Sequence, residues 1–71
     1  MAVVKVIELV GNSTVSWEDA AKNAVAEAAK TIRNITGVDV VGQTAAVENG
    51  AIKEFRANVK IAFLIERGEI A

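Results

Sequence analysis

The sequence predicts an α+β protein of β-α-β-β order, in which a three-stranded antiparallel sheet curves around one helix. Two observations favour this fold. The stretch Ile52–Glu66 alternates between apolar and polar side chains over most of its length, which is typical of a strand with two unlike faces. The stretch Trp17–Asn34 instead repeats apolar side chains at the spacing of one helix face. The whole chain, residues 1–71, is expected to be a single domain.

The first strand is predicted over Ala2–Val10, because this stretch is rich in β-branched residues. Lys5 and Glu8 interrupt its otherwise apolar rows, so both faces are expected to be partly covered. The sequence Gly11-Asn12-Ser13 is expected to end the strand as a turn.

The helix is predicted from Trp17 to about Asn34, with Ser16 as its N-cap. Its apolar stripe is mostly alanine, so the helix can lie close against a sheet. Thr36-Gly37 is expected to close the helix, with Gly37 in the left-handed conformation.

The second strand is predicted over Val38–Glu48, with a bulge or weak point at Gly42. Asn49-Gly50 then predicts a type I′ hairpin turn into the long strand Ile52–Glu66. The last residues, Gly68–Ala71, are expected to form a frayed tail.

The long strand carries more apolar surface than one helix can cover. A strand of this length spans about 50 Å, whereas the predicted helix is only about 27 Å long. The chain is 52% hydrophobic and has no cysteine or histidine, so neither disulfides nor the usual zinc sites can stabilise it. Self-association is the remaining route to stability for so small a domain.

Composition also excludes several classes of function. A net charge of -1 argues against nucleic acid as the main partner. No apolar run is long enough to span a membrane, and the start lacks the pattern of a signal peptide, so a cytoplasmic protein is expected. Without histidine or cysteine the familiar triads and thiol nucleophiles are absent, and the chain is not expected to be an enzyme.

Four segments carry a recognisable pattern in sequence and spacing: Lys5–Gly11, Ser16–Ala21, Thr31–Ile35 and Val59–Phe63. They resemble the dodecin family, and together with the length and element order the similarity covers nearly the whole chain. The resemblance implies a hollow homododecamer of tetrahedral symmetry. It also implies storage or sequestration of flavins such as riboflavin and FMN, which are held in stacked pairs at two-fold interfaces between subunits.

The family positions for the ligand carry unusual residues here. The resemblance places the flavin-stacking tryptophan of the family at Gly37, or at Val38 in a shifted register, and neither side chain can stack. It places the flavin-binding glutamine at Arg56, whose guanidinium can only donate hydrogen bonds. Arg56 could contact an anionic ligand or a flavin ring edge, or form a salt bridge between subunits. Flavin binding is therefore expected to be weakened or changed.

Two other features have competing interpretations. Trp17 could stack on an aromatic ligand, but packing at the start of the helix is favoured because the family's stacking residue lies elsewhere. Glu8, Glu54 and Glu66 could collect Ca²⁺ or Mg²⁺ in a symmetric shell, although a solvated or salt-bridged sheet face is the favoured interpretation.

Three hypotheses follow from the sequence. The first is a non-enzymatic, dodecin-like shell that binds flavins or related aromatic molecules. The alternative is a structural or cation-binding shell without flavin. The third is a subunit whose apolar sheet surface docks onto an unrelated protein.

Overall fold

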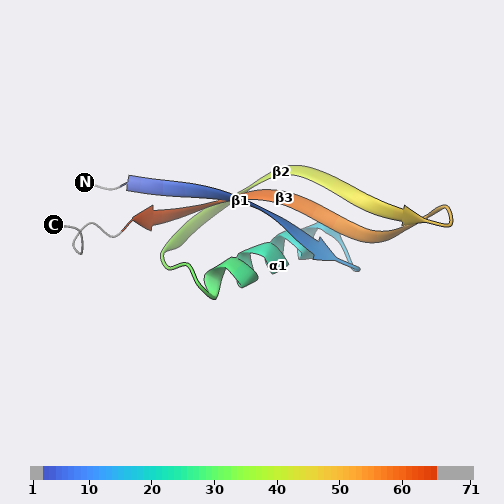
Figure 1. Cartoon of the computed structure of the whole chain (residues 1–71), viewed down its shortest axis with the longest axis horizontal. Helices are drawn as coiled ribbons and strands as arrows, with labels where there is room; N and C mark the ends of the chain where they lie inside the picture. Colours follow the sequence, from blue (N-terminus) through green and yellow to red (C-terminus); the bar gives the residue numbers. More distant parts are fainter. Residues whose placement is uncertain (1–2, 66–71) are drawn as a thin grey trace.

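A computed structural model describes residues 3–65. The element order is β1 (Val3–Ser13), α1 (Trp17–Ala29), β2 (Ile35–Glu48) and β3 (Ala51–Ile65). The strands form one antiparallel sheet in the order β1-β3-β2, so the long strand β3 lies in the centre. The chain is elongated, with extents of 56 × 20 × 14 Å, and the β2–β3 hairpin projects well beyond α1 (Figure 1). The predicted β-α-β-β fold is confirmed.

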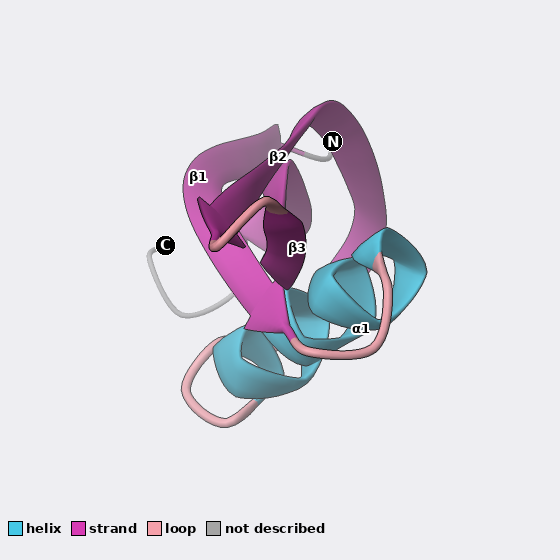
Figure 2. Ribbon diagram, turned by 90° about the vertical axis from the view of Figure 1, so that its right-hand side faces the viewer, coloured by secondary structure: helices cyan, strands magenta, loops and turns pink. Residues whose placement is uncertain are grey.

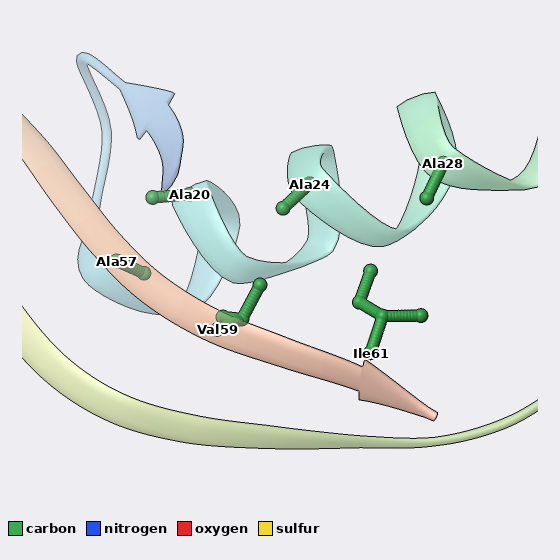
Figure 3. Close-up of a cluster of buried hydrophobic side chains, with 6 residues drawn as sticks. All are labelled: Ala20, Ala24, Ala28, Ala57, Val59 and Ile61. Atoms are coloured by element: carbon green, nitrogen blue, oxygen red, sulfur yellow. The ribbon is translucent and has the colours of Figure 1, made fainter. Parts of the chain in front are cut away.

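Helix α1 covers one face of the sheet and leaves the other without a helix (Figure 2). We call the face toward α1 the inner face and the opposite one the outer face. The core lies where the alanine stripe of the helix meets the middle of β3 (Figure 3). Its six buried residues are Ala20, Ala24, Ala28, Ala57, Val59 and Ile61.

The close approach of α1 to the sheet depends on Gly11. A Cβ atom at this position would lie 2.1 Å from the carbonyl oxygen of Ala20 and 2.9 Å from the Cβ of Ala24. Gly11 pairs with Ala57 inside the β1–β3 ladder, so the expected turn at residues 11–13 is wrong and β1 continues to Ser13. Gly11 therefore allows α1 to pack closely on the strand and does not form a turn.

The start of α1 is fixed by a network of polar groups. The Ser16 hydroxyl accepts a hydrogen bond from the Asp19 amide at 3.0 Å, which confirms the predicted N-cap. The buried Ser13 hydroxyl donates to the Asp19 carboxylate at 2.7 Å and accepts from the amide of Val15 at 2.9 Å. The end of β1 and the first turn of α1 are thereby joined.

The helix ends at Ala29, five residues earlier than predicted. Ile35 already pairs with Phe63 in the sheet, so the chain must leave the helix early enough to reach β3. Asn34, with φ 64°, takes the left-handed conformation that was expected at Gly37, whose φ is not positive. At about 1.5 Å per residue, α1 is only about 20 Å long.

The β2–β3 hairpin agrees closely with its prediction. Asn49 and Gly50 both have positive φ, 55° and 78°, as a type I′ turn requires. The ladder shifts register at Gly42, where a bulge was expected, and also near Gly37 and Val47. The predicted strand end at Glu66 and the tail Gly68–Ala71 lie outside the described residues.

Candidate ligand site on the outer face

The middle of the outer face carries a row of three charged residues. Lys60 on β3 pairs with Glu8 on β1 and with Asp39 on β2, so the lysine stands between two carboxylates in adjacent strands. None of the ion pairs formed among residues 3–65 involves Lys60. Its ammonium therefore remains available to a ligand or to a second chain.

Next to this row, the outer face has a hollow at Gly37. Gly37 pairs with Ala62 of β3, which in turn pairs with Val6 of β1, and the register places all three side by side across the sheet. A Cβ atom at Gly37 would meet nothing within 4 Å, so the space above the glycine is open. The hollow has a volume of about 310 Å³, and its lining consists of Val6, Gly37, Val38, Asp39, Lys60 and Ala62.

Arg56 lies far from this hollow within one chain. It pairs with Asn12 on β1 and Thr44 on β2. Six residues of β3 separate it from Ala62, which corresponds to about 20 Å. Its Nε and one terminal nitrogen both lie 3.2 Å from the same carboxylate oxygen of Glu54. One chain therefore does not bring Arg56 and Gly37 together, and a site that contains both needs a second copy.

The structure does not bring Val38, Glu8 and Glu54 together at one place on the sheet either. Val38 pairs with the buried Ile61 and therefore belongs to the inner face, although it also borders the hollow. Glu8 pairs with Lys60 of β3, and Glu54 lies six residues earlier on the same strand. The two carboxylates are therefore again about 20 Å apart. Residues 3–65 contain no group of three acidic or other metal-binding side chains. Glu66 lies outside the described residues.

Trp17 is held by the hairpin rather than exposed as a platform. Its indole N–H donates to the carbonyl oxygen of Thr44 at 2.8 Å. Its ring meets Phe55 edge to face, with centroids 4.8 Å apart. The interpretation of Trp17 as a packed residue at the helix start is confirmed, and the chain has no second tryptophan or any tyrosine.

Sequence reasoning missed Val6, Asp39, Lys60 and Ala62 as neighbours of Gly37. Part of the signal was available. Counting outward from the Asn49-Gly50 turn places Asp39 opposite Lys60, because the shift near Val47 is reversed near Gly42. The contribution of β1 could not be found this way, since no turn fixes its register with β3.

A small chain of β-α-β-β order, in which one helix covers a single face of a three-stranded antiparallel sheet, defines the class of fold. The dodecin family model matches residues 3–66, and this chain belongs to the dodecin family. A protein of Mycobacterium tuberculosis called calcium dodecin is 35% identical over 63 residues, which cover 89% of each chain.

Solved structures agree with this assignment. A dodecin from Streptomyces coelicolor superposes with a TM-score of 0.90 at 27% identity, covering 93% of this chain and 94% of the other. The calcium dodecin of M. tuberculosis, described as calcium-chelating with a novel calcium-binding site, gives 0.79 at 35% identity, covering 92% and 93%. Among the described residues, no helix has the length and apolar character needed to cross a membrane.

Proposed function

We propose that this protein is a single-domain, non-enzymatic subunit of a cytoplasmic homododecamer that binds and sequesters small molecules, with only weak affinity for flavins. The observation that carries this proposal is the open hollow at Gly37 on a sheet face that no helix covers. Such a hollow becomes an enclosed site when a second copy faces it.

Weak flavin binding follows from the side chains around the hollow. Its lining contains no aromatic residue, and the only tryptophan is held by Thr44 and Phe55. Stacking of a base-like ring on an aromatic side chain contributes roughly 1–3 kcal/mol. Its absence weakens binding by about one to two decades in Kd. Arg56 retains a donor for an anionic group, although Glu54 competes for it.

The test is a fluorescence titration with riboflavin and with FMN. We expect weak quenching for the natural sequence and binding about tenfold to a hundredfold tighter for Gly37→Trp, because one stacking contact is restored. The space above Gly37 accommodates the indole without a clash inside the chain. Arg56→Gln should add to this gain by restoring an acceptor.

Val38→Trp is the matched control, since it tests the alternative register. Val38 pairs with the buried Ile61 and only borders the hollow, so an indole at this position would project toward the helix side of the sheet rather than over Gly37. We expect no gain in flavin affinity for this variant. A gain for Val38→Trp together with none for Gly37→Trp would overturn the assignment of the stacking position.

Calcium binding is the second candidate, and the 35% identity to a calcium dodecin favours it. Carboxylates of Glu8 and Glu54, and of Glu66 beyond the described residues, would meet those of other copies around a symmetry axis. Ca²⁺ and Mg²⁺ both prefer such oxygen ligands. We expect calorimetry to detect Ca²⁺ binding that Glu8→Gln or Glu54→Gln weakens at least tenfold. Unchanged binding in both variants would exclude these residues.

Assembly itself is tested by light scattering coupled to size exclusion. A dodecamer has twelve times the 7.5 kDa mass of one chain. A monomer at micromolar concentration would overturn the proposal and favour docking of the sheet onto an unrelated protein.

A further inference from the structure

The turn between β2 and β3 joins a reactive pair of residues. Asn49 is the only asparagine of the chain that a glycine follows. In such a pair the backbone nitrogen of the glycine can attack the side-chain carbonyl carbon of the asparagine, because glycine has no side chain to obstruct the approach. Both residues are exposed, and they lie at the end of the hairpin that projects beyond α1 (Figure 1).

The surroundings of Asn49 leave its side-chain amide unprotected. None of the side-chain hydrogen bonds formed among residues 3–65 involves Asn49. A Cβ atom at Gly50 would meet nothing within 4 Å, so the space around the attacking nitrogen is also open. Neither a hydrogen bond nor steric cover therefore shields the two reacting groups.

The other four asparagines lack this combination of features. Asn12 and Asn58 lie inside paired strands, and the residue that follows each of them is buried. Asn23 lies in α1 and donates to the backbone carbonyl oxygen of Asn12 at 2.9 Å. Asn34 is followed by the β-branched Ile35, whose side chain hinders the approach of the nitrogen. Asn49 is therefore the asparagine that is most open to attack.

We propose that Asn49 is a site of spontaneous modification, at which the side-chain amide is lost and aspartate and isoaspartate are formed. The Gly50 nitrogen bonds to Cγ of Asn49, the bond from Cγ to Nδ2 breaks, and the proton of the Gly50 amide leaves with the ammonia. Water then cleaves one of the two C–N bonds of the cyclic imide. Cleavage at Cγ leaves aspartate, whereas cleavage at the backbone carbonyl leaves isoaspartate.

The type I′ turn controls how fast this reaction proceeds. Asn49 has a φ of 55°, and ring closure requires the Gly50 nitrogen to rotate out of the turn toward the Asn49 side chain. The turn must therefore open first. Opening disrupts only the pairing of Val47 with Ile52 and the exposed ion pair of Glu48 with Lys53 at 2.6 Å. Such a hairpin end opens at a much lower free energy than the core.

The two products affect the hairpin differently. Aspartate tolerates the left-handed conformation and adds one negative charge to a chain whose net charge is -1. Isoaspartate adds a backbone carbon to a two-residue loop, so the type I′ turn no longer fits. We expect the ladder to open from its end toward Thr44, where the indole of Trp17 holds the hairpin. The hollow at Gly37 lies outside this region, so the inference is independent of the proposed function.

The test is to age the natural chain at neutral pH and to follow each asparagine by peptide mass spectrometry. We expect an amide to be exchanged for a carboxylate in the peptide that contains Asn49 and not in the others. A carboxyl methyltransferase specific for isoaspartate, supplied with S-adenosylmethionine, should then methylate the aged chain. Asn49→Gly keeps a pair that forms type I′ turns, and it should accept no methyl groups.

Val10→Asn provides a matched control inside the same chain. This substitution places an asparagine before Gly11, which is buried beneath α1 and pairs within the β1–β3 ladder. Val10 is 57% exposed on the outer face, so the variant should keep its fold. We expect the introduced asparagine to react at least tenfold more slowly than Asn49 in the folded chain, because its backbone is released only when the core opens. In urea the two sites should react at similar rates.

The outcomes decide each part of the inference. Absence of isoaspartate from the aged natural chain, or equal amounts in Asn49→Gly, would overturn the modification at Asn49. Equal rates at Asn49 and at the asparagine of Val10→Asn in the folded chain would overturn the role of the hairpin end. A rate difference that persists in urea would assign it to neighbouring residues and also overturn that role. None of these results depends on the assembled mass or on flavin affinity, which test the proposed function separately.

Discussion

On the inner face of the sheet Val59 and Ile61 are completely buried, whereas on the outer face Val6 and Val10 remain 52% and 57% exposed. Both faces carry aliphatic side chains on paired strands, so hydrophobicity does not distinguish them. The difference lies in the small residues that let the helix approach. Gly11 and Ala57 lie beneath the alanine stripe of α1, and this close contact exists on one face only.

The comparison shows how a short chain divides its apolar surface. The inner face supplies the core of the single chain. The stability of this core comes from close packing of α1 against a small area of the sheet. The outer face and β2 keep their valines exposed, among them Val6, Val10, Val38 and Val40, and other copies would cover them in the proposed assembly. Substitutions matched across the two faces can break or sharpen this division. All stabilities should be compared at one chain concentration, because assembly adds to the apparent stability.

The largest effect is expected from Gly11→Ala. The new Cβ would lie 2.1 Å from the backbone oxygen of Ala20, and backbone cannot move aside as the end of a side chain can. We expect a loss of about 3 kcal/mol, at the upper end for overpacking, measured by urea unfolding. Gly37→Ala is the control, since its Cβ meets nothing within 4 Å, and it should change stability by less than about 0.5 kcal/mol. Similar losses in both variants would contradict the close approach of α1 at Gly11.

A smaller effect is expected from Val59→Ala. It removes buried methyl groups beside the alanine stripe and leaves a cavity, at a cost of about 2.5 kcal/mol. Val6→Ala removes the same atoms from the outer face and should cost the dissociated chain about 1 kcal/mol or less, because the side chain is already half exposed there. If thermal unfolding at a concentration at which the chain is dissociated gives equal costs, the outer face is buried as deeply as the core, and the division between the faces is wrong.

Most of the fold could be predicted from the sequence, because its signals are local. The alternation along β3, the N-cap Ser16 and the Asn49-Gly50 turn each act within a few residues, and each is confirmed. The errors fall where long-range packing overrides the local signal. Gly11 looks like a turn residue until the helix above it is known, and Asn34 takes the left-handed conformation because β2 joins the sheet earlier than expected.

The candidate site was less predictable, because it depends on register. The resemblance pointed to Gly37 and Arg56, but only the ladder shows that about 20 Å separate them in one chain. The position of Glu8 opposite Lys60 comes from the pairing of two strands that are distant in sequence. No local pattern encodes such a pairing, so the outer-face site had to be read from the structure.

The smallest effect is expected at the boundary between the covered and uncovered parts of β3, where Trp17 contacts the hairpin. Trp17→Phe keeps a ring against Phe55 but removes the hydrogen bond to the Thr44 carbonyl oxygen. Because this site is exposed, water can donate to the Thr44 carbonyl oxygen in place of the indole. We expect the free energy of unfolding to fall by about 1 kcal/mol, as measured by circular dichroism during denaturation. Trp17→Ala also removes the ring contact and should cost about 1 kcal/mol more than Trp17→Phe. If the two variants are equally stable, the ring contact contributes nothing, and the hydrogen bond alone ties α1 to the β2–β3 hairpin.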